Sequence, residues 1–258
     1  MYVGNLSLSN HAGIGIYAYD SGGNICFIKT VHPEISAGCM VIDSPNRRLY
    51  CVDERVCDSN GLPGGKVYSF LINETTGDLT MLSYVRTCTT LPCSLALNTQ
   101  RSQLLVSNYG KRDLSVIYTK TPDGQMENRL CCDTTAVLVF PIDSRGQIGD
   151  PVDLWVPNEQ PSFSRDNSHL HTIVKAPGYD LFAVCDTGRN KLHILRLKGD
   201  KVEHCGYQEK ALTDAGPRYC VYHPELPLLY LNCEKADKLY VFRYDLNKQN
   251  WWMLLSFH

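Results

Sequence analysis

A repeated two-strand unit constrains the fold of this chain more than any other feature of its sequence. In each copy a short apolar run is followed by a turn and by a second apolar run that ends at a polar residue. The first and last residues of the copies are 15, 15, 15 and 16 positions apart. Three copies carry a proline six positions after their first residue, where its fixed φ suits a turn. The copies are Cys39–Glu54, Ser94–Tyr109, His171–Asp186 and Arg218–Glu234.

Each copy is followed by an apolar run that can form a third strand, namely Val67–Ile72, Leu114–Tyr118, Leu192–Leu197 and Leu239–Tyr244. Three or four strands per unit, at a period of roughly 40 to 50 residues, are typical of a β-propeller. We therefore predict an all-β chain that forms a single propeller domain over residues 1–258. The 258 residues hold about five to six blades if Gly13–Thr30 and Thr134–Leu154 are counted as degenerate units.

The composition is that of a globular protein, with 43% hydrophobic and 20% charged residues, so a large buried core is expected. Lys and Arg number 25 against 27 Asp and Glu. The resulting net charge of −2 supplies no broad basic field, so neither nucleic acid nor a membrane is expected as a partner. The sequence contains no run of 18 apolar residues and no signal peptide, which predicts a cytoplasmic protein.

The 12 cysteines are scattered and form no CxxC pair, which favours reduced thiols and matches no zinc-binding pattern. Gly13-Ile14-Gly15 is a fragment of a dinucleotide-binding motif, but no helix is expected after it. We therefore expect neither a metal nor a cofactor.

The register of the repeat predicts where polar groups gather. Two antiparallel strands joined by a turn bring the first and last residues of a copy together at the open end of the hairpin. Such residues in successive blades would face one mouth of the central channel, and they include acids, bases and a cation that can process a polar substrate. The predicted set is Cys39, Glu54, Ser94, Tyr109, His171, Asp186, Arg218 and Glu234.

These strand-end residues also have an ordinary structural interpretation, because polar groups there often bond to backbone or solvent, and non-catalytic propellers have polar rims too. Asn108 and Tyr109 suit a turn, and Asp186 suits a contact with backbone N–H groups. His169 points to the opposite face of a regular strand from His171 and is expected to be structural. The register alone does not choose between the two interpretations.

Several short motifs resemble one known family, in its order and over nearly the whole chain. They are Val3-Gly4, Gly15-Ile16-Tyr17, Val52-Asp53-Glu54 with Gly65-Lys66-Val67, Ser107-Asn108-Tyr109-Gly110, Ser168-His169-Leu170-His171, Val184-Cys185-Asp186-Thr187-Gly188, Ala215-Gly216-Pro217-Arg218 with Tyr222-His223-Pro224, and Asn232-Cys233-Glu234. The chain resembles the 6-phosphogluconolactonase family of seven-bladed propellers, whose superfamily includes the fungal-type carboxymuconate cyclases.

The resemblance implies that His171, Arg218 and Glu234 form the active site. We further predict that Glu54, Asn108, Tyr109 and Asp186 bind the substrate. The chain departs from the family where Tyr219 replaces a histidine and Arg189-Asn190 replaces an aspartate. It also ends at His258, where the family continues through strands that carry another arginine and close the ring, so a C-terminal part is expected to be missing.

The activity implied by the resemblance is hydrolysis of 6-phosphogluconolactone, a small anionic sugar lactone, in the pentose phosphate pathway. Ester hydrolysis needs an activated water and a stabiliser for the oxyanion. Arg218 suits the oxyanion or the substrate anion, and either His171 or Glu234 suits the base. Two alternatives remain, a carboxymuconate cycloisomerase using the same residues and a non-catalytic binding propeller. The oligomeric state is not readable from the sequence.

Overall fold

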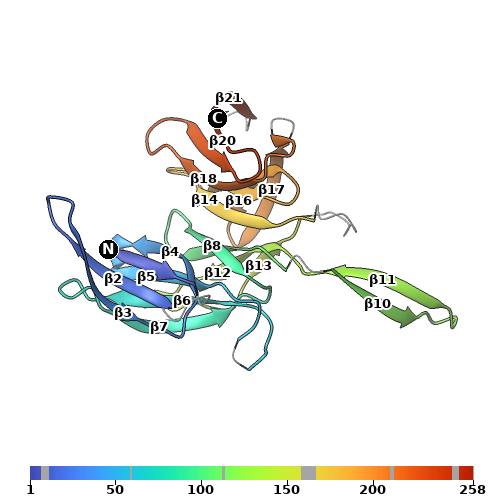
Figure 1. Ribbon diagram of the computed structural model, residues 1–258, viewed down its shortest axis with the longest axis horizontal. Helices are drawn as coiled ribbons and strands as arrows, with labels where there is room; N and C mark the ends of the chain where they lie inside the picture. The colour runs from blue at the N-terminus through green and yellow to red at the C-terminus, as the bar shows by residue number, and fades with distance from the viewer. Residues whose placement is uncertain are drawn as a thin grey trace.

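The chain is built almost entirely of β-strands, which confirms the predicted fold class (Figure 1). A computed structural model describes residues 1–6, 12–58, 60–111, 114–157, 167–209, 212–245 and 250–257. A short 3₁₀ turn at Ser44–Asn46 interrupts the strand pattern. Within these ranges no helix is long and apolar enough to cross a membrane.

Five antiparallel sheets follow one another along the chain, and we call them the first to fifth blades. The first has three strands, β1 (Tyr2–Asn5), β2 (Gly13–Tyr19) and β3 (Ile25–Val31). The second contains β4 (Ala37–Asp43), β5 (Arg48–Asp53), β6 (Lys66–Ile72) and β7 (Leu79–Arg86). The third contains β8 (Pro92–Leu97), β9 (Gln103–Asn108), β12 (Ala136–Pro141) and β13 (Asp153–Trp155).

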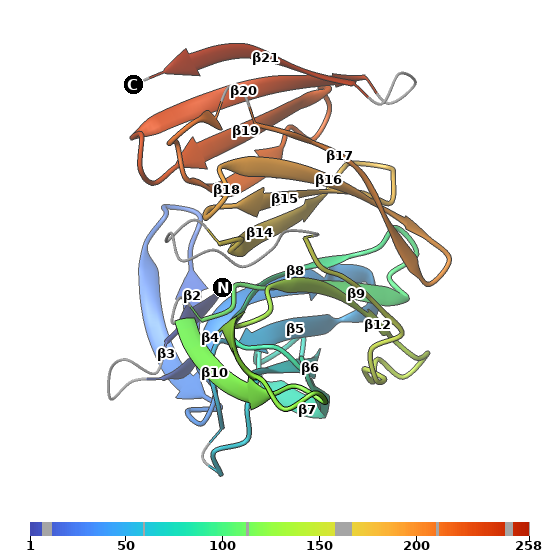
Figure 2. The same cartoon turned by 90° about the vertical axis from the view of Figure 1, so that its right-hand side faces the viewer.

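The fourth blade contains β14 (Leu170–Lys175), β15 (Leu181–Asp186), β16 (Lys191–Lys198) and β17 (Lys201–Gln208). The fifth contains β18 (Pro217–Tyr222), β19 (Leu228–Cys233), β20 (Lys238–Asp245) and β21 (Asn250–Phe257). The four predicted repeats therefore correspond to the first two strands of the second to fifth blades. The first strand of each of these blades lies at a sheet edge, and β8 contacts both β4 and β14, while β14 contacts β18 (Figure 2).

The third blade corrects two expectations from the sequence. Leu114–Tyr118 is not a blade strand, because it belongs to β10 (Leu114–Lys120), which pairs only with β11 (Met126–Cys132) in a separate hairpin (Figure 1). The third strand is β12, which pairs with β9. Thr134–Leu154 is accordingly not a degenerate unit but contains β12 and the start of β13, so the described residues form five blades.

The difference in burial between β12 and β10 shows why apolar character alone pointed to the wrong third strand. Ala136 to Phe140 of β12 are all buried, whereas Val116 and Tyr118 of β10 are 49% and 69% exposed. Both runs are rich in strand-forming residues, and a strand propensity does not say which partner a strand will pair with. The choice follows from packing against the neighbouring blades.

The core consists of four apolar layers, one between each pair of successive blades. Alternate residues of one strand point to opposite faces of a sheet, so Leu104 and Val106 of β9 pack toward the second blade and Leu105 toward the fourth. Both faces of the middle strands are therefore buried, which explains their continuous apolar runs. Full burial of a side chain of this size contributes about 1.5–3 kcal/mol.

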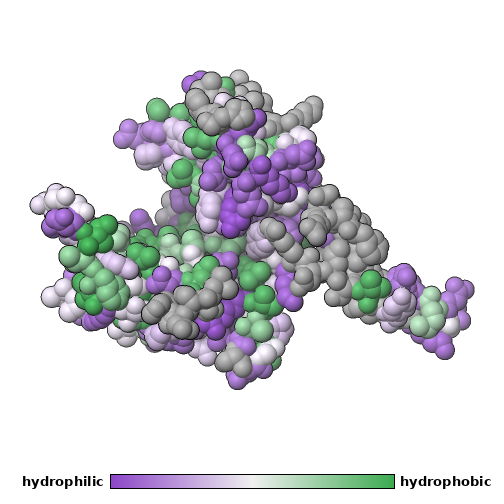
Figure 3. All heavy atoms as spheres, viewed as in Figure 1, coloured by the Kyte–Doolittle hydropathy of each residue, from purple (hydrophilic) through white to green (hydrophobic). Residues whose placement is uncertain are grey.

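The first blade exposes more apolar surface than the others. Tyr19, Ile25 and Phe27, at the end of β2 and in β3, are 72%, 59% and 59% exposed. In the space-filling view, apolar residues gather over the part of the molecule that these strands form (Figure 3).

Candidate active site

A β-bulge recurs at the start of the first strand in four blades. The pairing shifts by one residue between Ala37 and Met40, between Pro92 and Ser94, between Leu170 and Ile173, and between Pro217 and Tyr219. His171 and Arg218 lie within the last two of these bulges. An extra residue in a strand bends the strand and changes the direction of its side chains, which explains how His171 and Arg218 point toward a common site.

The strand pairing corrects the register expected from the sequence. The last residues of the second strands are Asp53, Asn108, Asp186 and Cys233, and each pairs with the residue before the bulge. Asp186 is therefore the counterpart of Asp53 and not of Glu54. A slip of one residue along a strand sends a side chain to the other face, so Asp186 and Glu54 have different surroundings.

Arg218 and Glu234 form an ion pair at the open end of the β18–β19 hairpin. Arg218 Nη1 donates to Glu234 Oε2 at 2.5 Å, and the two side chains are 35% and 29% exposed. Burial lowers the pKa of the Arg218 guanidinium, but its hydrogen bonds and electrostatic interactions with Glu234 and Tyr219 together outweigh that effect and raise the pKa. The guanidinium is therefore a cation at neutral pH.

His171 lies beside this pair and is only 6% exposed. Its ring meets Tyr219 edge-on at 4.8 Å and Tyr109 at 5.9 Å between ring centroids, and Nδ1 lies 3.2 Å from Thr172 Oγ1. Burial, reinforced by the charge of Arg218 and opposed by Glu234, lowers the pKa of His171 to about 4. The imidazole is therefore neutral at pH 7.

Glu54 approaches the same place from the second blade. Burial raises the pKa of its carboxyl, and the positive charge of Arg218 partly counteracts that shift. The carboxylate lies over Gly38, where a Cβ would collide with Glu54 Oε2. The thiol of Cys93 is buried, and burial raises its pKa, an effect to which the charge of Glu54 adds and which the charge of Arg218 opposes. The Glu54 carboxyl of the second blade thus lies within electrostatic range of the Arg218 cation of the fifth.

Tyr109 follows β9 and joins the cluster through its ring. It meets His171 edge-on and stacks on His169 at 4.7 Å, while His169 Nδ1 lies 3.0 Å from the Tyr109 carbonyl oxygen. Asn108 is fully buried, and its amide donates to the carbonyl oxygens of Val106 and Ala136 at 3.4 and 3.5 Å. The structure therefore brings Tyr109 to His171 and places the Asn108 amide inside its own blade.

Asp186 is also fully buried, and its carboxylate accepts hydrogen bonds from backbone N–H groups. Oδ1 receives the N–H groups of His169, Gly188 and Arg189 at 2.9, 3.1 and 3.1 Å. The hydrogen bonds and ion pairs of Asp186 that the structure describes do not include His171, Arg218 or Glu234. Asp186 thus makes the contact with backbone N–H groups that the sequence suggested as its structural role.

Three residues near the cluster were not predicted as functional. Tyr219 lies between His171 and Arg218, with its ring 5.7 Å from the guanidinium carbon, and Cys93 and Thr172 line the same region. The sequence did distinguish Tyr219, because this residue stands directly after Arg218, where the family has histidine. Cys39 and Ser94, expected on the rim, lie one residue past the bulge positions Gly38 and Cys93, and Ser94 Oγ instead accepts the Ile173 N–H at 3.2 Å.

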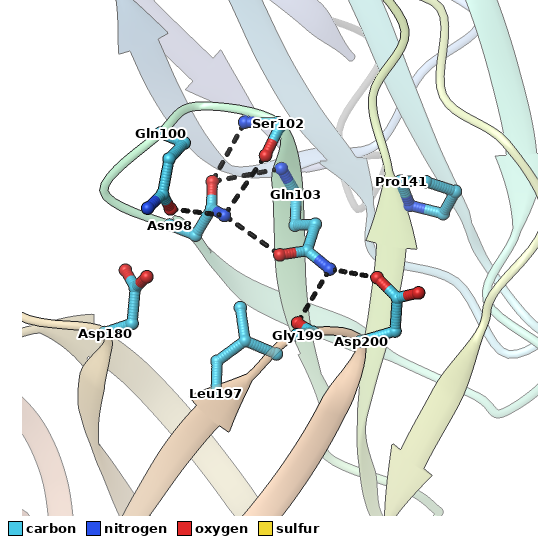
Figure 4. Close-up of a pocket in the computed structure, with 9 residues that line it drawn as sticks. All are labelled: Asn98, Gln100, Ser102, Gln103, Pro141, Asp180, Leu197, Gly199 and Asp200. Carbon is cyan, nitrogen blue, oxygen red and sulfur yellow. Dashed lines mark hydrogen bonds between the residues drawn. The ribbon is translucent and has the colours of Figure 1, made fainter.

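Two cavities lie elsewhere, and neither is lined by the cluster. One of about 440 Å³ lies between the third and fourth blades, where the Gln103 amide donates to Asp200 Oδ1 at 2.7 Å and accepts from the Asn98 amide at 2.9 Å (Figure 4). The Asn98 and Gln103 amides that line this cavity are thus hydrogen-bonded to each other, and the Gln103 amide also binds Asp200 of the fourth blade. The second, of about 530 Å³, follows the inner strands β4, β8, β14 and β18. Across the described ranges, no three His, Cys, Asp or Glu side chains are grouped as a metal site requires.

Comparisons with known proteins agree with this fold. The family model described as "Lactonase, 7-bladed beta-propeller" matches residues 1–253. A 6-phosphogluconolactonase from Bacillus subtilis is 22% identical over 182 residues, which cover 70% of this chain and 45% of the relative. The structure of a periplasmic gluconolactonase from Pseudomonas aeruginosa matches with a TM-score of 0.79 at 20% identity, over 99% of this chain.

A solved structure from Lactobacillus plantarum matches with a TM-score of 0.77 at 16% identity, again over 99% of this chain. In both structures the match covers 66% of the other chain, so this chain spans about two thirds of their length. At these identities the similarity shows a shared fold.

Proposed function

This chain belongs to the lactonase family of seven-bladed β-propellers, and we propose that it hydrolyses 6-phosphogluconolactone to 6-phosphogluconate. The name of the Bacillus subtilis relative supports the substrate, and the Pseudomonas aeruginosa relative is named for a related sugar lactone. The observation that carries the proposal is the position of Arg218. One carboxylate, Glu234, holds the guanidinium, and a second carboxyl, Glu54 of the second blade, lies within its electrostatic range.

Lactone hydrolysis moves charge in a defined way. The oxygen of a water attacks the carbonyl carbon, the carbonyl oxygen becomes an oxyanion, and the water loses a proton. The bond between that carbon and the ring oxygen then breaks, and the ring oxygen receives a proton, which leaves a hydroxyl group and a carboxylic acid. The acid loses its remaining proton to water and becomes the carboxylate. The site must therefore supply a cation for the oxyanion and a base for the water.

Arg218 is proposed to stabilise the oxyanion. Its guanidinium stays charged and has five N–H donors, of which the bond to Glu234 engages Nη1. Glu234 fixes the orientation of the planar group, and the edge-on His171 ring supports the same region through Tyr219. A donor held in place before the reaction needs no reorganisation when negative charge develops.

Glu54 is proposed as the base. The Glu234 carboxylate is committed to Arg218, and the His171 imidazole is buried, contacts Thr172 Oγ1 and hydrogen-bonds the Arg218 backbone. Burial raises the pKa of Glu54, which makes it a stronger base than an exposed glutamate while it remains near Arg218. This assignment replaces the choice between His171 and Glu234 that the sequence left open.

The test is hydrolysis of fresh 6-phosphogluconolactone by the purified chain, measured against the spontaneous rate. We expect acceleration by the wild-type protein and a loss of roughly 10²-fold or more in kcat for Glu54→Gln. Glu225→Gln, the same change at an exposed residue of the fifth blade, serves as the matched control and should keep wild-type rates. A folded wild-type protein that does not accelerate the reaction overturns the proposal.

A further inference from the structure

A buried polar network lies outside the cluster, in the fourth blade. Asp186 of β15 is fully buried and His193 of β16 is 3% exposed, and His193 Nε2 lies 3.4 Å from Asp186 Oδ2. His193 Nδ1 lies 3.2 Å from Nε2 of His204 on β17. Trp155 of the third blade stacks on His204 at 5.2 Å and meets His193 edge-on at 5.0 Å.

Proton positions in this network follow from the chemistry of its members. The hydrogen bonds that Asp186 accepts lower its pKa despite burial, so its carboxylate is ionised and only accepts. His193 Nε2 must therefore carry a proton and donate to Asp186. A neutral His193 then accepts at Nδ1 the proton that His204 Nε2 donates.

Asp186 joins the two ends of the β14–β15 hairpin. Its Oδ1 accepts the N–H of His169, just before β14, and the N–H groups of Gly188 and Arg189, just after β15. The two segments lie so close that a Cβ on Gly188 would collide with the carbonyl oxygen of Asn167. We call this set of three hydrogen bonds to Asp186 Oδ1 the hairpin joint.

The hairpin joint reaches the cluster over a short path. His169 stacks on Tyr109 and contacts its carbonyl oxygen through Nδ1, and His171 follows two residues later within the bulge. The Tyr109 ring in turn meets His171 edge-on. A shift of the His169 backbone would therefore move both His171 and Tyr109.

The second blade contains a related contact, in which an aspartate also binds the backbone before the first strand but has a different side-chain partner. Asp53, the counterpart of Asp186, accepts the Ser36 N–H at 2.7 Å and is paired with Arg55, whose Nε donates at 2.9 Å. In the fourth blade the side-chain partner of the aspartate is instead a histidine, His193 of β16.

We propose that His193 is a positioning residue for the reaction site, acting through Asp186 on His169, His171 and Tyr109. The inference rests on the proposed function, because the site it serves is the one described above. His193 donates to a buried carboxylate that would otherwise have no side-chain cation or donor from β16, and a buried ion without its partner is costly.

The charged and titratable groups around His193 are Asp186, His204, Lys191 and Tyr207. Lys191 Nζ lies 4.5 Å from the centre of the Tyr207 ring, and Tyr207 packs against both histidines. Burial, with added effects of His193 and Lys191, lowers the pKa of His204. His193 Nδ1 and His204 Nε2 lie 3.2 Å apart, so only one of these two nitrogens can carry a proton in the hydrogen bond between them.

The test compares His193→Phe with His193→Gln. Phenylalanine keeps a ring against Trp155 but removes the donor to Asp186, whereas glutamine keeps an N–H donor. We expect His193→Phe to speed hydrogen exchange at the His169 and Gly188 amides at least tenfold and to lower kcat about ten- to hundredfold with a smaller change in KM. His193→Gln should restore most of both properties.

Arg55→Gln is the matched control, because it changes the partner of Asp53 in the second blade. It should speed exchange at the Ser36 amide and leave the His169 amide unchanged. If His193→Phe does not fold, His193→Leu, which also removes the donor to Asp186, replaces it. Exchange at the His169 and Gly188 amides, measured at one fixed pH, should again be faster in that variant than in the wild-type protein and His193→Gln.

Unchanged exchange at His169 in His193→Phe overturns the proposal, as does faster exchange with a wild-type kcat. Equal exchange at the His169 amide in His193→Leu and the wild-type protein also overturns it. A wild-type protein without lactone turnover overturns the proposed function instead, and the exchange rates still decide whether His193 holds the hairpin joint.

Discussion

Arg218 and Glu234 stand at the two ends of one hairpin, and the bulge at Arg218 turns its guanidinium so that Nη1 donates to Glu234 Oε2 at 2.5 Å. Both side chains are about one-third exposed, and an ion pair in that setting contributes little to stability. The pair therefore matters for orientation. The pair holds a permanent cation, the Arg218 guanidinium, within electrostatic range of Glu54 and His171.

Changing Arg218→Lys should keep the charge but lose the planar group that Glu234 orients. An ammonium ion presents its donors in other directions, so the oxyanion is less well stabilised. We expect kcat to fall about ten- to hundredfold with an intact fold. Steady-state kinetics and a thermal unfolding curve check both parts. Wild-type kcat in this variant would contradict the oxyanion role.

The rate should fall at acid pH because the base must be ionised. Burial raises the pKa of Glu54 above the ordinary glutamate value of 4.5, so its carboxylate is lost at a higher pH than in an exposed glutamate. The kcat/KM of the wild-type protein should decrease as pH falls through that raised pKa. A pH profile of Glu54→Gln, corrected for spontaneous hydrolysis, should lack this limb. A wild-type midpoint at or below 4.5 would argue against Glu54.

His171 should make the folded protein sensitive to acid. Its pKa is about 4 in the folded protein against 6.5 in an exposed histidine, so the unfolded chain binds more protons between these values. The stability that comes from a neutral His171 is therefore complete above about pH 6.5 and is lost as pH falls toward 4. The change amounts to about 3 kcal/mol.

Urea unfolding of the wild-type protein and His171→Phe between pH 4 and 8 measures this term. Phenylalanine fills the space between Tyr109 and Tyr219 and does not titrate. The free energy of unfolding of the wild-type protein should fall relative to the variant as pH decreases through this range. Parallel curves for the two proteins would show that His171 is not buried in its neutral form.

The β10–β11 hairpin should be dispensable for folding. β12 pairs directly with β9, and the equivalent connection in the fifth blade, from Cys233 to Lys238, has only four residues between the strands. Replacing residues 112–131 by a short Gly-Ser linker keeps Asp133, whose carboxylate accepts the Lys111 N–H at 2.9 Å. We expect the midpoint of urea unfolding to change little. Loss of cooperative unfolding would show that the hairpin supports the third blade.

The repeat was predictable because strand and turn signals are local. Spacing and turn residues located both strands of the second to fifth blades, and burial on two faces made their apolar runs continuous. The same reasoning failed at Leu114–Tyr118, because tertiary packing decides which strand joins the third blade. Its residues favour a strand as strongly as those of β12, and only contact with the second and fourth blades distinguishes them.

The candidate site was predictable only in part. His171, Arg218, Glu234 and Glu54 were named from motifs and repeat positions, and the structure brings them together. Asp186 was placed on the rim because a bulge in the first strand is invisible in a count of residues, and one extra residue changes the face on which a partner lies.

By itself, the sequence determined an all-β chain of repeated antiparallel units with acids, a histidine and an arginine near strand ends, because these properties depend on spacing and residue type. Only the tertiary structure decided which carboxylate meets which cation. Glu54 and Arg218 are 164 positions apart and belong to different blades, so their approach depends on how the blades pack around a common centre. The neutral state of His171 likewise follows from burial that no local pattern encodes.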